Sequence, residues 1–263
     1  MKRQKELFYL FLILVFSILL RLFQIQSLPG EWYGDISNVH EYMIEITSGK
    51  WPFYFFQSAG PFYHYLIYPI ILLFKNQGYE TYKYASIFVS FLGFIGTYLF
   101  VKEIRGIKLA LITILIMSFS FWYLVWSRLG NSQIVIPVLI SFMSYFIVRY
   151  LKRGHTRDAV YGLIVSMLGL YTYPQTYFLP VLFIFIYAVN LLVTKNFKAR
   201  EVLLLLGMAA AAGLTFIFIL MRQPDNFGAS GYVGSKFWPF LNLGIINFIS
   251  ILTERYIKIL GSQ

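Results

Sequence analysis

The sequence predicts an all-α membrane protein with about seven transmembrane helices and a long first outer loop. Three observations support this prediction: the composition, the length of the apolar segments and the placement of the basic residues. Of the 263 residues, 59% are hydrophobic and only 13% are charged, whereas a soluble domain is about 45–50% apolar and about 25% charged. The mean hydropathy of +0.67 also indicates a polytopic membrane protein.

Seven apolar segments account for the expected spans across about 30 Å of hydrocarbon. They are residues 7–24, 84–101, 109–126, 134–148, 159–171, 176–194 and 202–221. Segments 134–148 and 159–171 are short and are expected to extend into their flanks. The first segment resembles a signal peptide, but its apolar run is too long and no small-residue cleavage site follows. We therefore interpret it as an uncleaved first span.

The apolar segment 62–74 is only 13 residues long, and the positive-inside rule decides its placement. With a cytoplasmic N-terminus and no crossing at 62–74, thirteen of the 22 basic residues fall in four short cytoplasmic segments. These are Lys2, Arg3 and Lys5; Lys102, Arg105 and Lys108; Arg149, Lys152, Arg153 and Arg157; and Lys195, Lys198 and Arg200. A crossing at 62–74 would move every cluster except the first outside. We therefore expect 62–74 to be a half-buried juxtamembrane helix on the outer face.

Two regions follow from this topology. Residues 1–221 form a transmembrane module with a first outer loop at 25–83, and residues 222–263 form an outer loop and an interfacial helix at 237–260. No further span follows, so we expect the chain to be the N-terminal part of a longer protein. The net charge of +11 lies in short clusters between apolar segments, as topology signals do, so no nucleic-acid partner is expected. The absence of cysteine excludes disulfides and thiolate metal sites.

Residues 31–45 of the first outer loop carry four of the eleven carboxylates, Glu31, Asp35, Glu41 and Glu45. Asp35 precedes an amphipathic stretch that places Val39, Met43 and Ile46 on one face. The dipole of that helix would favour an ionised Asp35, as a general base requires. The alternative is that Asp35 only caps the helix.

Other candidate residues lie around this loop. Glu41 and Glu45 share a helical face and could approach a divalent metal, to which His40 and His64 could add nitrogen ligands; the alternative is a solvated face. Arg128, at the outer end of the third span, could either snorkel to head groups or grip a phosphate. Arg222 and Lys236 are weaker candidates of the same kind.

Tyr173 lies in the tyrosine-rich tract 171–177 between the fifth and sixth spans. Tyrosine at that depth is usually an interfacial belt residue. The alternative is that its ring stacks on a sugar.

Several motifs in order make the chain resemble a known family. They are Gly34-Asp35, Gly49-Lys-Trp51-Pro52, Gly60-Pro-Phe-Tyr-His-Tyr-Leu66, Trp126-Ser-Arg-Leu-Gly130 and Gly169-Leu-Tyr-Thr-Tyr-Pro174. With the first span, they resemble the polytopic glycosyltransferases of the GT-C fold, specifically the dolichyl-phosphate-mannose–protein mannosyltransferase and aminoarabinose-transferase-like branch.

The resemblance implies a GT-C-like membrane enzyme that transfers a sugar from a polyprenyl-phosphate-linked donor. The acceptor would be a protein, lipid or glycan at the outer face of a cell membrane. Asp35 corresponds to the essential aspartate of the family and would act as base toward the acceptor hydroxyl, with inversion at the anomeric carbon. The donor phosphate would sit against basic side chains, with Arg128 as the candidate. Arg222, His64, Glu41 and Tyr173 complete the candidate substrate-binding set.

The chain departs from the family pattern at three places. Ile36 follows Asp35 where the family often has Glu, Gly60 stands where an acid often precedes the proline, and Asn131 lies in a turn that often holds Asp. These departures leave the metal open: the enzyme works without one, or Glu41, Glu45 and the histidines substitute, or the activity is altered.

Two other functions remain as alternatives. A lipid-linked-glycan transporter or flippase component would need a polar path across the bilayer, and the expected spans carry no charge near their middle. An inactive truncated fragment would fold in part and turn over nothing.

Overall fold

The computed structural model describes residues 2–30, 32, 34–53, 60–74 and 78–222. Their elements are α1 (Lys2–Leu22), α2 (Gly34–Thr47), α3 (Phe62–Phe74), α4 (Tyr79–Arg105), α5 (Ile107–Phe119), α6 (Phe121–Trp126), η1 (Ser132–Ile134), α7 (Val135–Arg153), α8 (Thr156–Leu168), η2 (Gly169–Tyr171), η3 (Pro174–Thr176), α9 (Leu179–Thr194) and α10 (Ala199–Arg222). Every regular element in this part of the chain is helical. Glu31, Lys236 and the expected interfacial helix at 237–260 lie outside the described residues.

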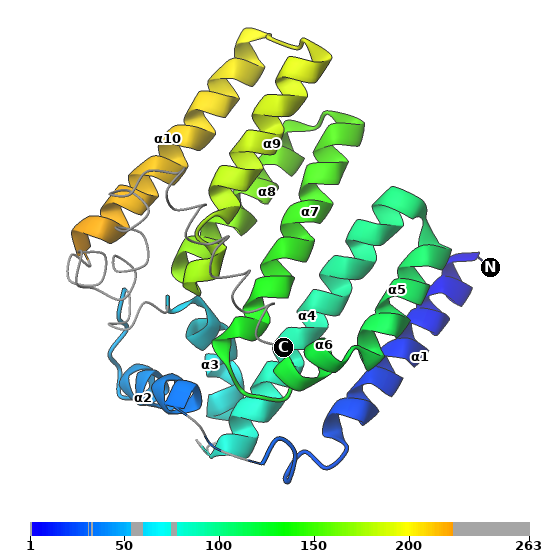
Figure 1. Cartoon of the computed structure of the whole chain (residues 1–263), viewed down its shortest axis with the longest axis vertical. Coiled ribbons are helices and arrows are strands. Elements are labelled where there is room, and N and C mark those ends of the chain that lie inside the picture. The colour runs from blue at the N-terminus through cyan, green and yellow to red at the C-terminus, as the bar shows by residue number, and fades with distance from the viewer. Residues whose placement is uncertain (1, 31, 33, 54–59, 75–77, 223–263) are drawn as a thin grey trace, which may run out of the picture.

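The long helices stand side by side, with α4 and α7 at the centre of the row (Figure 1). On one side of this pair, α5 packs against α4 and α1 packs against α5. On the other side, α8 packs against α7, followed by α9 and then α10. Helices α2 and α3 lie together where the long helices end on one side of the molecule, at the bottom of Figure 1, and we call this side the α2 end.

Four of the seven expected spans correspond to helices long and apolar enough to cross a membrane. Within the described residues these are Tyr79–Arg105, Ser132–Arg153, Pro174–Thr194 and Ala199–Arg222. They indicate a multi-pass membrane protein. The other three expected spans correspond to α1, to α5 with α6, and to α8. Helices α5 and α8 have 13 residues each, so each is only about 20 Å long. Helix α1 carries several charges. For these reasons the structure does not establish seven spans.

The expected continuous helix at 109–126 is interrupted at Ser120, which adopts an extended backbone (φ −55°, ψ 119°) between α5 and α6. The interruption turns α6 so that the Tyr123 hydroxyl donates to the backbone oxygen of Ser90 in α4, at 2.6 Å. Gly93 makes room for that ring, because a Cβ at this position would overlap the Tyr123 hydroxyl. A buried tertiary hydrogen bond thus replaces the straight helix that the apolar pattern predicts.

The α2 end matches the sequence pattern closely. Helix α3 spans the predicted residues 62–74, and α2 buries Val39, Met43 and Ile46 on one face together with Ile36. Val39, Met43 and Ile46 belong to the same apolar core as Tyr63 and Ile67 of α3. Ile36 is fully buried as well. Taking each of the four from water is worth roughly 1.5–3 kcal/mol, so burial holds α2 firmly across the bundle.

The opposite ends of the long helices carry the basic clusters, and we call this side of the molecule the basic end. Here the carboxylate of Glu6 on α1 pairs with Lys102 on α4, and Glu103 on α4 pairs with Arg153 on α7 at 2.7 Å. The turn between α7 and α8 and the turn between α9 and α10 lie at this end as well (Figure 1). The expected cytoplasmic clusters therefore gather at one end of the molecule, and Asp35 lies at the other.

Candidate functional site

Asp35 lies in the first turn of α2, and its side chain is exposed. Its Oδ2 accepts a hydrogen bond from the side-chain amide of Asn131, at 3.3 Å. Asn131 is 2% exposed, and its own Oδ1 accepts from the backbone N–H of Gln133 and from the hydroxyl of Ser132. A buried and anchored amide therefore orients an exposed carboxylate, and no residue in the described ranges donates a hydrogen bond to its other oxygen.

An aromatic cluster holds the start of α2 against the start of α4. The indole Nε1 of Trp32 donates to the Ser37 hydroxyl at 2.8 Å. Its ring lies 5.3 Å from that of His40 and 5.5 Å from that of Tyr79. His40 Nδ1 and the Tyr82 hydroxyl are 2.9 Å apart. Because Trp32 is 40% exposed, the cluster also presents an aromatic surface in the segment that leads into Asp35.

Arg128 is held against the segment that follows α1. Its side chain is 8% exposed, and its Nη2 donates to the backbone oxygens of Phe23 and Leu28, at 2.6 and 2.9 Å. Burial lowers the pKa of the Arg128 guanidinium below its ordinary value. The structure thus places Arg128 beneath the first outer loop, and not free at the surface as a snorkelling side chain would be.

Lys83 binds the same segment from α4. It is 1% exposed, and its Nζ donates to the backbone oxygens of Ile25 and Pro29, at 2.8 and 2.7 Å. The ammonium also lies 4.3 Å from the centre of the Tyr79 ring. Its charge is close enough to that of Arg128 for the two to repel each other.

Arg21, near the end of α1, is a third buried cation in this region. Its Nη1 donates to the backbone oxygen and hydroxyl of Ser17, at 3.2 and 2.5 Å, and its guanidinium lies over the rings of Phe94 and Tyr123. Its Nε and Nη2 are buried and make no hydrogen bond within the described residues. The three cations form no ion pair with any described carboxylate, so the region keeps an excess positive charge. A buried charge is normally paired, so this excess favours an anionic ligand.

The sequence analysis did not single out Lys83, Arg21 or Trp32. A signal for the two cations was present, because each lies within or next to an apolar segment. A charged residue there is a functional-site candidate by default. Nothing in the sequence pattern pointed to Trp32, which is recognised only by the rings that tertiary packing brings around it.

The remaining candidates are spread over the α2 end. His64 is buried in α3 with its ring against Tyr42, and burial lowers the pKa of His64 to about 3, so the ring is neutral. Glu41 is exposed on α2. Tyr173 precedes η3, and its backbone oxygen accepts from Thr176. Asn131 contacts Asp35 directly, whereas the contacts named here for His64 and Tyr173 are to other residues.

Arg222 ends α10 with its guanidinium 5.3 Å from the centre of the Phe218 ring. Phe218 in turn contacts the ring of Phe53 in the first outer loop, at 5.1 Å. Arg222 thus reaches the edge of the same outer region from the far side of the helix row.

A family model described as dolichyl-phosphate-mannose-protein mannosyltransferase matches residues 58–221, which is more than half of the chain. The chain belongs to this family. No curated protein and no solved structure matches it. Members of the mannosyltransferase family are polyprenyl-phosphate-sugar-dependent membrane glycosyltransferases.

The family match covers Lys83, Arg128 and Asn131, and it begins after Asp35 and Glu41. Two glycines inside the matched range serve close backbone contacts at the α2 end. A Cβ at Gly60 would overlap the backbone of Tyr171, and Gly130 has φ +77° with Tyr82 packed against it. The mannosyltransferase match therefore extends to the residues that fold the outer loop against the helix ends.

Metal ligands do not converge in the described part of the chain, where no three His, Asp or Glu residues lie close enough to hold an ion. Glu41 and Glu45 are both exposed on α2, and His64 is buried. The residues described here do not fit a metal centre, and we derive no step through one.

Proposed function

We propose that this chain transfers a sugar from a polyprenyl-phosphate-linked donor to an acceptor hydroxyl at the outer membrane face. The mannosyltransferase family match over residues 58–221 carries the proposal. The α2 end supplies the support from the structure. It combines an oriented carboxylate, three buried cations that form no ion pair within the described residues, and an exposed aromatic surface. The acceptor is a protein, a lipid or a growing glycan.

Asp35 acts as the general base in this proposal. Its free carboxylate oxygen takes the proton from the acceptor hydroxyl as the acceptor oxygen attacks the anomeric carbon. The bond from that carbon to the phosphate oxygen breaks on the opposite face, which inverts the configuration, and the electron pair leaves with the polyprenyl phosphate. The hydrogen bond from Asn131 keeps Asp35 aimed during the step.

The leaving polyprenyl phosphate gains negative charge, and the buried cations stabilise it. Lys83 and Arg128 bind backbone oxygens of residues 23–29. Two fixed positive charges therefore lie against that segment. Arg21 adds a third charge behind it. Fixed positive groups of this kind stabilise a developing anion without reorganising during the reaction.

The other candidate residues take supporting places in the proposal. Trp32 and Tyr173 offer ring faces to the sugar, and Glu41 and Arg222 contact polar groups of donor or acceptor at the rim. His64 is buried and neutral, so it supports the packing of α2 on α3 beneath Asp35.

The first test is turnover by purified protein in nanodiscs with a panel of radiolabelled polyprenyl-phosphate sugars. Replacing Asp35 by Asn keeps the size of the side chain and removes the base, so kcat is expected to fall at least about 100-fold. The matched control is Glu45→Gln, which removes an exposed carboxylate from the same helix α2 and is expected to leave kcat unchanged.

Sugar release that persists in Asp35→Asn would remove Asp35 from the role of base. No turnover with any donor by a folded wild-type protein would favour the transporter or truncated-fragment alternatives.

A further inference from the structure

Residues 23–30 follow α1 and lead toward α2, and we call them the strap. They form turns and no regular helix. Among their side chains only that of Ile25 is buried, at 6% exposed, whereas Phe23 and Leu28 are 65% and 48% exposed. The strap is therefore a thin layer, with exposed side chains on its outside and the buried cations Lys83 and Arg128 beneath it.

Four hydrogen bonds from these two cations hold the strap on the helices. Lys83 binds two of its backbone oxygens and Arg128 binds two more, all at 2.6–2.9 Å. The hydrogen bonds that backbone N–H groups of the strap donate go to other strap residues or to the end of α1. Apart from the side chain of Ile25, the strap thus depends on Lys83 and Arg128 for its position.

The strap is an incomplete partner for the cations that it covers. Its carbonyl oxygens are neutral, and none of the described carboxylates pairs with Lys83, Arg128 or Arg21. The Nε of Arg128 and the Nε and Nη2 of Arg21 are buried and have no hydrogen-bond partner within the described ranges. The charges of the two arginines are close enough to repel each other. A phosphate group would supply both the missing acceptors and the missing negative charge, and hydrogen bonds to charged oxygens are roughly twice as strong as those between neutral groups.

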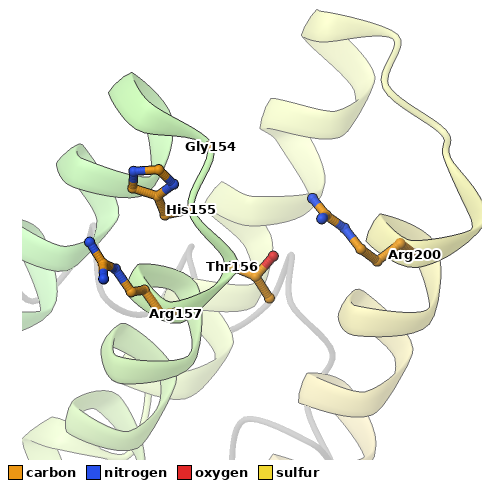
Figure 2. A pocket seen from close by; sticks show the side chains of 5 residues that line it. All are labelled: Gly154, His155, Thr156, Arg157 and Arg200. Carbon is orange, nitrogen blue, oxygen red and sulfur yellow. The ribbon is translucent and has the colours of Figure 1, made fainter.

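The basic end shows the opposite arrangement. Figure 2 shows a pocket there, and Arg200 is one of the residues that line it. Arg200 donates from Nε and Nη2 to the carboxylate of Glu201, so its charge already has a counter-ion. The cations beneath the strap have none among the described residues, which makes their region the better place for an added anion.

We propose that the strap covers the phosphate site in the donor-free protein and that the phosphate of the lipid-linked donor displaces it. Phosphate oxygens then replace the carbonyl oxygens on Lys83 and Arg128, and Arg21 donates its unused N–H groups from behind them. The cations keep their places and the strap moves. Because the chain continues from the strap to Trp32 and Asp35, this movement links arrival of the donor to the segment that carries the base. The inference rests on the proposed function, since it describes how that same site opens.

The test uses a single cysteine, because the chain contains none of its own. Ile25→Cys places a thiol beneath the strap, and its rate of reaction with a water-soluble maleimide is measured on the full chain in nanodiscs. Polyprenyl phosphate without a sugar is added in one arm, the corresponding prenol in a second and inorganic phosphate in a third. Polyprenyl phosphate is expected to raise the rate at least about tenfold, the factor that one hydrogen bond to a charged group contributes to an opening equilibrium. The other two additions are expected to leave the rate unchanged.

Ile46→Cys is the matched control, because Ile46 is a second buried isoleucine at the α2 end, 1% exposed, and lies outside the strap. Its labelling is expected to stay slow in every arm. A rise in both variants would show a general loosening and overturn the proposal. Adding Lys83→Gln to Ile25→Cys removes two of the four hydrogen bonds and is expected to speed labelling without any lipid, while Ile46→Cys with Lys83→Gln stays slow. An unchanged Ile25→Cys rate in that background would show that the cations do not hold the strap.

Native mass spectrometry of the same samples separates this inference from the proposed function. Bound polyprenyl phosphate with an unchanged Ile25→Cys rate would overturn the strap and leave the transferase proposal standing. Failure of polyprenyl phosphate to bind would overturn both. A faster rate with the prenol would assign the movement to the apolar chain, and an equal effect of inorganic phosphate would assign the site to soluble phosphate. Either of these two results overturns the proposal.

Discussion

Asn131 supplies the amide that hydrogen-bonds to Asp35. The family pattern often places an Asp in this turn, yet here the side-chain amide donates to Asp35. Two carboxylates about 4 Å apart would repel each other by about 1–4 kcal/mol, depending on the effective dielectric constant, unless a cation bridged them. An amide removes that requirement and supplies a hydrogen bond in its place.

The corresponding prediction concerns the variants Asn131→Asp and Asn131→Ala. In Asn131→Ala the lost hydrogen bond to a charged group, worth about 1.5 kcal/mol, is expected to lower kcat roughly tenfold. In Asn131→Asp, repulsion favours the protonated form of Asp35, so the acidic limb of the pH–rate profile should move to higher pH. Steady-state kinetics from pH 4 to 9 measure both effects. An unchanged profile in Asn131→Asp would mean that Asn131 acts only in folding.

At the scale of elements, the outer loop docks on the turn between α8 and α9 through Gly60. The backbone N–H of Gly60 donates to the backbone oxygen of Thr172, at 2.6 Å. A Cβ at Gly60 would overlap backbone atoms of Tyr171, which cannot move aside as the end of a flexible side chain can. This contact positions the start of α3, and α3 carries α2.

Gly60→Ala is therefore expected to destabilise the protein by about 1–3 kcal/mol. The thermal midpoint should fall by roughly 2–4 °C for each kcal/mol. Gly207→Ala is the control, because a Cβ at Gly207 in α10 meets no atom within 4 Å. Thermal unfolding of both variants in the same detergent makes the comparison, and equal midpoints would show that the loop is not docked as described.

At the scale of the whole molecule, the basic turns and helix α2 lie at opposite ends of the long helices (Figure 1). From the positive-inside rule we predict that the basic end lies in the cytoplasm and Asp35 outside. Helix α3 has 13 residues, about 20 Å in length, which is too short for a simple crossing. The residues before and after it should therefore lie on one side of the membrane.

Cysteine labelling tests this topology directly, because the chain contains no cysteine of its own. A membrane-impermeant maleimide is expected to label Lys50→Cys and Glu80→Cys, on either side of α3, from outside intact cells. Lys108→Cys, at the basic end, should react only after permeabilisation. Opposite labelling at positions 50 and 80 would show that α3 crosses the membrane.

Local patterns were sufficient for the parts of this protein that depend on one segment at a time. The apolar face of α2, the bounds of α3 and the candidate spans in α4, α7, α9 and α10 were predicted because each follows from periodicity or length within a single stretch. The family was predicted from the order of short motifs, and its match confirms it. Asp35 was chosen for its place at the start of an amphipathic helix, and it remains a proposal.

Tertiary packing decided what brings distant segments together. Ser120 breaks an apolar stretch because Tyr123 finds a buried partner on α4, and no pattern within 109–126 carries that information. Lys83 and Arg128 converge because both bind the carbonyl oxygens of residues 23–29. Sequence by itself therefore determined the membrane class, helices α2 and α3, four of the candidate spans and the family of this protein. Only the tertiary structure decided which polar groups meet, because hydrogen bonds and charges act over a few ångströms, here between residues 33 to 105 positions apart.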